Sequence, residues 1–169
     1  MANYPINNSQ PCYSTNPYAG GLTHGLAFTD VLERMYRYTH KQQYMDYCLF
    51  LYKGFSERVL HEDAQYQKLI DKKLALKAHG VHTYEHLRSV AAAWYASGNP
   101  ALQNAMINFL QKINKTITPS GAPAGDEFIG ARNGDATTTG YEYCSLLELM
   151  DGYLDLLAKT GDADFGDKA

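Results

Sequence analysis

The sequence predicts an all-α protein made of helical hairpins that form part of an (α/α) toroid or barrel. Three observations support this fold class. Apolar residues recur at helical spacing in four separate stretches. No stretch alternates apolar and polar residues convincingly, so strands are not expected. A third pattern recurs along the 169 residues: a glycine near the start of a helix is followed, where that helix should end, by a short polar turn.

The first hairpin is expected to begin near His24-Gly25 and to turn at Thr39-His40-Lys41. The turn leads into an apolar stripe that occupies one face of a second helix. The stripe consists of Tyr44, Cys48, Leu51, Tyr52 and Phe55.

The second hairpin begins at His79-Gly80 and turns at residues 97–100. Pro100 suits the first position of a helix, where its missing N–H would have no partner in any case. The two stripes comprise Leu87, Val90, Ala91 and Trp94, then Leu102, Met106, Phe109, Leu110 and Ile113.

The third hairpin begins at Thr139-Gly140 and turns at Thr160-Gly161-Asp162. Its first helix carries the stripe Leu146, Leu149, Met150, Tyr153, Leu154 and Leu157. The second helix is expected to start within residues 164–169 and to be incomplete.

Residues 1–169 are therefore interpreted as one incomplete (α/α)-barrel catalytic domain of three helical hairpins, the last one truncated. A helix pair buries its apolar face only against its neighbours. We expect the chain to be a fragment, or to be completed by another polypeptide. We also expect self-association through exposed apolar surface.

Composition excludes several classes of function. Hydrophobic residues make up 45% and charged residues 20%, which favours a globular over a disordered chain. A net charge of -3 gives no reason to expect nucleic acid or an anionic membrane as partner. No apolar run is long enough to span a bilayer, and the first residues do not resemble a signal peptide, so localisation stays undefined. Cys12, Cys48 and Cys144 form no disulfide framework.

Residues 116–139 lack helical periodicity and carry the adjacent acids Asp126 and Glu127. A structureless segment of this length inside a compact domain is uncommon and often functional. A surface loop without a function is the alternative.

Two further groups of residues have the chemistry of a site. Glu142 and Cys144 carry a carboxylate and a thiol that both suit zinc, and an irregular helix start would let them converge. A buried structural cysteine is the alternative. His79, His82 and His86 lie on one helix face, and with His24 they could hold a metal, bind a polar substrate or serve as core histidines.

Three segments, in this order, resemble glycoside hydrolase family 127, the β-L-arabinofuranosidase family. The first is His79-Gly80-Val81 with Trp94-Tyr95 and the turn Ser97-Gly98-Asn99. The second is Gly125-Asp126-Glu127 followed by Gly130 and Arg132, which is similar to an acidic G-D-E loop. The third is Gly140-Tyr141-Glu142-Tyr143-Cys144 with Leu146 to Met150 and the turn at 160–162, which is similar to an E-x-C helix. The resemblance covers residues 78–169.

The resemblance implies a retaining glycosidase whose nucleophile is a cysteine thiolate held on zinc. It implies Glu127 as the general acid/base, His79 as a sugar-contacting histidine, and Glu142 and Cys144 as two zinc ligands. Asp126, His82 and His24 are expected to line the substrate site. The family's two downstream cysteines have no counterpart here, so this chain alone is expected to lack the nucleophile, to hold zinc weakly or not at all, and to be inactive.

The expected partner is a carbohydrate, an arabinose-containing plant glycan. Two alternatives stay open. One is another (α/α)-toroid carbohydrate enzyme, such as an unsaturated glucuronyl hydrolase or a sugar epimerase, which needs no cysteine. The other is a non-catalytic helical sugar-binding or scaffold module.

Overall fold

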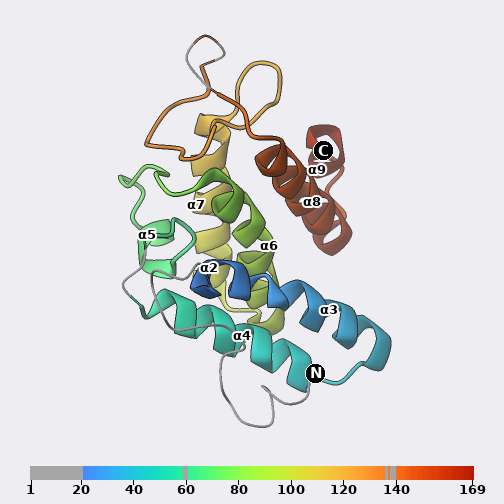
Figure 1. The fold of residues 1–169 in the computed structure, drawn as a ribbon. Helices are drawn as coiled ribbons and strands as arrows, with labels where there is room; N and C mark the ends of the chain where they lie inside the picture. The colour runs from blue at the N-terminus through green and yellow to red at the C-terminus, as the bar shows by residue number, and fades with distance from the viewer. Residues whose placement is uncertain (1–20, 59–60, 136, 138–139) are drawn as a thin grey trace.

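The structure is a computed structural model, and it describes residues 21–58, 61–135, 137 and 140–169. Within these ranges the secondary structure is helical and no strand forms; the extended contacts are isolated bridges. Figure 1 shows the helices in chain order, which are α2 (Gly21–Leu26), α3 (Phe28–Thr39), α4 (Gln43–Ser56), α5 (Tyr66–Ile70), α6 (Gly80–Ser97), α7 (Pro100–Thr116), α8 (Tyr143–Thr160) and α9 (Asp164–Lys168). The all-α prediction is confirmed. Cys12 lies outside the described residues.

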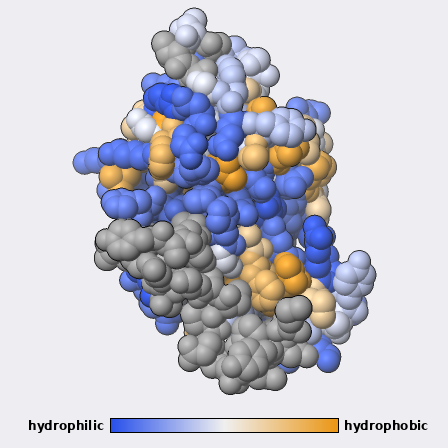
Figure 2. All heavy atoms as spheres, viewed as in Figure 1, coloured by the Kyte–Doolittle hydropathy of each residue, from blue (hydrophilic) through white to orange (hydrophobic). Residues whose placement is uncertain are grey.

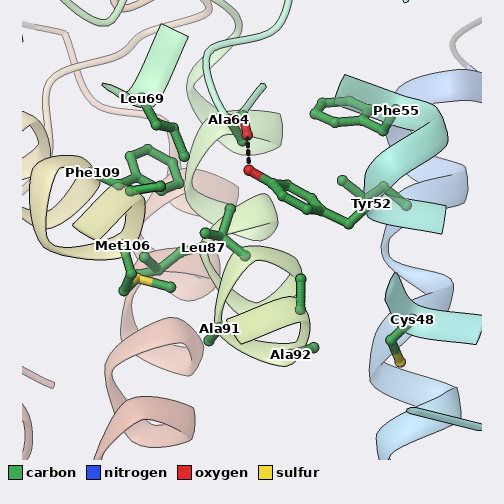
Figure 3. Packing of buried hydrophobic residues seen from close by; sticks show 14 of the residues in the cluster. Cys48, Tyr52, Phe55, Ala64, Leu69, Leu87, Ala91, Ala92, Met106 and Phe109 are labelled. Carbon is green, nitrogen blue, oxygen red and sulfur yellow. Dashed lines mark hydrogen bonds between the residues drawn. The ribbon is translucent and has the colours of Figure 1, made fainter. Parts of the chain in front are cut away.

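Helix α6 is the central element, because α3, α4, α7 and α8 all pack against it. Its middle is lined with small and apolar side chains, including Leu87 and Val90, which are fully buried. Ala91, Ala92 and Ala93 follow and let neighbouring helices approach closely. Figure 3 shows Leu87 and Ala91 facing Met106 of α7, with Phe109 and Leu69 completing that side of the core. Burying a large apolar side chain contributes roughly 1.5–3 kcal/mol, so this core holds the helices together.

On the other side of α6, residues of α4 complete the core. Cys48, Tyr52 and Phe55 are all buried, as the helical stripe predicts. The Tyr52 hydroxyl donates a hydrogen bond to the carbonyl of Ala64 over 2.9 Å, so its polar end is satisfied inside the core (Figure 3).

The three predicted turns are all present. The helices α3, α6 and α8 each end at a residue in the left-handed conformation, namely His40, Gly98 and Gly161. The backbone N–H of each of these residues donates to a carbonyl of the last helical turn. Glycine adopts this conformation at no steric cost, whereas His40, with a φ of 54°, adopts it without that freedom.

The third hairpin continues into α9, which begins at Asp164 as expected. Phe165 of α9 stacks on Tyr153 of α8 with ring centroids 6.2 Å apart. The face of α8 away from α6 keeps Tyr143, Leu147 and Leu154 exposed. Apolar atoms are visible over this helix in Figure 2. Self-association through such a face stays a prediction.

None of the described helices combines the length and the apolar character that a membrane crossing requires.

Candidate functional site

The candidate site forms where residues 76–80 meet residues 127–131, at the N-terminal end of α6. The backbone N–H of Gly80 donates to the carbonyl of Glu127 over 2.9 Å. The N–H of Ile129 donates to the carbonyl of Ala78, also over 2.9 Å. These bonds hold residues 127–129, which lie far along the chain from α6, across the start of that helix.

The same loop also contacts the start of α8. The N–H of Glu142 donates to the carbonyl of Gly125 over 3.1 Å, and the N–H of Gly125 donates to the carbonyl of Gly140 over 3.4 Å. A Cβ at Gly80 would lie 2.9 Å from the Ser145 Oγ and 3.6 Å from the Gly125 Cα. A larger residue here would displace the Ser145 hydroxyl, so glycine suits this close approach, and the three segments that carry the resemblance meet at Gly80.

Glu127 and His79 form the central pair of the site. The Glu127 Oε1 lies 3.1 Å from the His79 Nε2, with the Glu127 side chain 67% exposed and the His79 side chain 20% exposed. The structure thus brings Glu127 next to His79. Its role as acid/base stays a prediction.

Asp126 points to a different partner. Its Oδ1 accepts a hydrogen bond from the Arg132 Nη2 over 2.5 Å, and this contact holds the pKa of the Asp126 carboxyl below its ordinary value. The side chain is exposed. A Cβ at Gly140 would lie 2.5 Å from the Asp126 Cβ, so the glycine leaves room for the acid. Asp126 is therefore paired with Arg132, and its contact with substrate stays a prediction.

A chain of titratable side chains extends inward from the exposed surface. The His24 Nε2 lies 3.2 Å from the His82 Nε2, and the His82 Nδ1 lies 3.3 Å from the Glu62 Oε1. The rings of His79 and His82 are 4.5 Å apart between centroids. The segments thus bring together three of the four histidines named from sequence. They also add Glu62, which precedes α5 and had no sequence signal.

His86 differs from the other histidines, because it is fully buried. Its Nδ1 is 3.8 Å from the Glu62 Oε2, and its ring is edge-on to Phe55 at 5.1 Å. Of the three readings left open from sequence, the core histidine describes His86 best.

Burial shifts the pKa of two titratable side chains near these histidines, His24 and Glu85. Desolvation and the nearby His82 and His79 lower the pKa of His24. Desolvation, together with the nearby Glu148, raises the pKa of Glu85 to about 7. Glu85 was not selected from sequence. Its position between His82 and His86 on one helix face was the signal that could have revealed it.

Glu142 and Cys144 lie at the start of α8, and their convergence on zinc stays a prediction. Glu142 precedes the first turn of α8 with an extended backbone, φ −107° and ψ 127°. Its Oε2 is buried without a hydrogen-bond partner in the described part of the chain, whereas Cys144 is exposed. An unpartnered buried carboxylate oxygen and a nearby thiol are compatible with zinc.

The zinc set is nevertheless incomplete. Among the described residues, no group of three or more His, Cys, Asp or Glu side chains is placed to hold a metal ion. A tetrahedral zinc site needs four ligands, and Glu142 and Cys144 supply only two donors.

Comparisons of this chain with models of protein families, with curated proteins and with solved structures find no match. The site is therefore described by its own geometry. An exposed carboxylate, that of Glu127, lies beside the His79 ring where three chain segments meet.

Proposed function

We propose that this chain forms part of a retaining glycoside hydrolase that resembles β-L-arabinofuranosidase and belongs to an (α/α) toroid. The observation that carries the proposal is the convergence of three segments at Gly80. The same segments, found in the same order, carry the resemblance. Helical proteins of many kinds share hairpins, whereas this juxtaposition brings an acid, a histidine and a carboxylate–thiol pair to one end of the bundle.

The surroundings of Glu127 support a role as general acid/base. Its carboxyl is exposed to an incoming ligand and is held by His79 at 3.1 Å. In this role it protonates the oxygen of the leaving sugar and, in the second half of the reaction, removes a proton from water. His79 orients the carboxyl, and its ring edge faces Phe128 at 5.6 Å.

Exposed aromatic side chains suit a sugar ligand at this end of the molecule. Phe128, Tyr141 and Tyr143 are 56%, 44% and 72% exposed and belong to the two segments that meet Gly80. Aromatic rings offer a flat apolar face to a sugar ring, and tyrosine adds a polar tip. The proposed ligand is an arabinose-containing plant glycan.

The resemblance assigns the nucleophile to a zinc-bound thiolate. Zinc makes a thiolate available at neutral pH, and Glu142 and Cys144 would supply two of its four ligands. The other two are cysteines that we propose come from the polypeptide that supplies the remaining hairpins.

A kinetic comparison of Glu127→Gln with the unchanged protein tests the proposal, in the assembly that carries all four zinc ligands. General acid/base catalysis contributes roughly 10²–10⁴-fold, so kcat on an arabinofuranoside disaccharide should fall by that order. The rate of the first half-reaction should fall less with p-nitrophenyl β-L-arabinofuranoside, because its leaving group needs little protonation. Glu57→Gln, an exposed acid next to α4, is the matched control.

Three results would contradict the proposal or redirect it. Equal rates for Glu127→Gln and the control would remove the acid/base role. Full activity of Cys144→Ser would favour a different (α/α)-toroid enzyme, an unsaturated glucuronyl hydrolase or a sugar epimerase. Glycan binding without any turnover would favour the non-catalytic module.

A further inference from the structure

Basic residues gather on one side of this acidic chain. Six of its ten lysines lie in residues 68–77 and 112–115, although the net charge of the whole chain is -3. These lysines line three adjoining hollows bounded by α5, the segment that follows it and the end of α7. We call this surface the basic track; its lysines are Lys68, Lys72, Lys73, Lys77, Lys112 and Lys115.

The largest hollow of the track combines cationic and apolar walls. It has a volume of about 520 Å³ and is lined by Lys68, Lys77 and Lys112 together with Leu74, Leu76 and other apolar residues. A sugar ring bearing an acidic group presents the same combination of an apolar face and a charged edge.

One of these lysines is built into the floor of the hollow. Lys112 is only 6% exposed, and its Nζ donates to the carbonyls of Lys68 and Asp71 over 2.6 and 2.8 Å. These two bonds leave one of its three N–H donors for a ligand. Burial lowers the pKa of both Lys68 and Lys112, so an anion in the hollow would offset part of their desolvation.

Acidic residues are fewer than lysines along the track, where Asp63 lines the largest hollow and Asp71 lies between two of the lysines. The Asp63 Oδ2 accepts hydrogen bonds from the backbone N–H groups of Lys77 and Ala78, over 2.7 and 2.8 Å, and from the Thr83 hydroxyl over 3.3 Å. All three bonds go to one oxygen of Asp63, which also lines the largest hollow and favours the charged forms of Lys68 and Lys112. Asp71 is the one acidic residue within the two lysine-rich segments. Within the described part of the chain, Lys72, Lys73, Lys77 and Lys115 form no salt bridge.

The track begins at the candidate site. Phe128 lines the largest hollow and also lies edge-on against His79, the partner of Glu127. A second hollow shares Leu74, Leu76 and Lys112 with the first and adds Lys115 and Arg132. A chain lying in the track would therefore extend from Glu127 across several cations in succession.

We propose that the basic track binds an anionic polysaccharide, a sugar chain whose carboxylates or sulfates recur along its length, with one end at Glu127. The proposal rests on the proposed glycosidase function and defines its substrate class. A single-stranded nucleic acid fits less well, because its binding sites stack successive bases on aromatic side chains. Phe128 is the one Phe, Tyr or Trp side chain that lines these three hollows among the described residues.

Isothermal titration of this chain with an oligogalacturonide, a sulfated glycan of matched length and a neutral arabinan tests the proposal without any need for turnover. The test variant is the triple substitution Lys72→Gln, Lys73→Gln, Lys77→Gln, whose side chains are exposed. The control variant, Lys41→Gln, Lys53→Gln, Lys168→Gln, loses the same charge outside the track.

We expect both anionic glycans, or the one whose acid group matches, to bind more tightly than the arabinan, with an affinity that falls as salt is added. The track variant should weaken this binding about tenfold or more, and the control about twofold or less. Equal losses in the two variants, salt-insensitive binding, or tighter binding of a single-stranded RNA of the same charge would each overturn the proposal. The track variant separates the two ideas: salt-sensitive binding that it weakens supports the track even if the complete assembly proves inactive, whereas turnover of the assembly that depends on Glu127 but not on the track lysines supports the glycosidase alone.

Discussion

Glu85 gives the sharpest test of the electrostatics at the candidate site. Its side chain is 13% exposed, and its Oε2 is buried without a hydrogen-bond partner among the described residues. Glu148 and Asp30 oppose its ionisation, whereas Arg88 and His82 favour it. The His24 Nδ1 lies 3.8 Å from the same oxygen. Desolvation outweighs these partners, and the pKa of Glu85 rises from 4.5 to about 7.

The stability change follows from the linkage between proton binding and folding. A carboxyl with a raised pKa binds its proton more tightly in the folded than in the unfolded protein. Its favourable contribution is therefore complete below the unfolded pKa of 4.5 and is lost as the pH rises through about 7. At 1.36 kcal/mol per pH unit, the difference between the two pKa values corresponds to about 3 kcal/mol. Ionised Glu85 should thus destabilise the fold by this order above neutral pH.

Glu85→Gln keeps the size of the side chain and removes the charge. In urea unfolding, the variant should exceed the stability of the unchanged protein by about 1 kcal/mol at about pH 5 and by about 3 kcal/mol at about pH 8. His24 titrates in both proteins, so its opposite contribution largely cancels in the difference. Glu57→Gln, at an exposed position, should show no such trend. A stability difference for Glu85→Gln that does not change with pH would refute the reasoning.

Three other predictions concern packing, capping and the metal. Lys159→Met should cost about 3–5 kcal/mol of unfolding free energy, because it leaves the buried carboxylate of Glu33 without its partner at 2.8 Å. Chemical denaturation should show much of this loss recovered when Glu33→Leu is added to Lys159→Met. Asn99→Ala should cost about 1 kcal/mol of unfolding free energy, because the Asn99 side chain accepts a hydrogen bond from the Ala101 N–H at the start of α7. Asn104→Ala, at an exposed position within α7, should cost less. Equal losses in the two variants would argue against the cap. Metal analysis of this chain should find zinc well below one equivalent, whereas in the assembly with all four ligands Cys144→Ser should lose metal and activity together. Stoichiometric zinc in the chain alone would contradict the ligand assignment.

The sequence alone determined the helices and the turns between them. Stripes such as Leu102 to Ile113 predicted α7, and Pro100 and Gly98 marked where it begins and where α6 ends. These features are local, since helical periodicity, a fixed proline φ and the conformational freedom of glycine act over a few residues. The acids at 126–127 and the histidines of α6 were likewise visible as candidates from residue type and spacing.

Only the tertiary structure decided which of these candidates meet. Glu127 reaches His79 because a loop is bonded across the first turn of α6, and Glu62 reaches His82 because its segment packs against the same helix. His86, one turn further along the same helix face, lies instead in the core. Such contacts depend on long-range packing and on burial, which also sets the pKa of Glu85, and neither quantity is encoded in local spacing. The sequence could therefore name the chemical groups, while the fold decided their partners and their exposure to solvent.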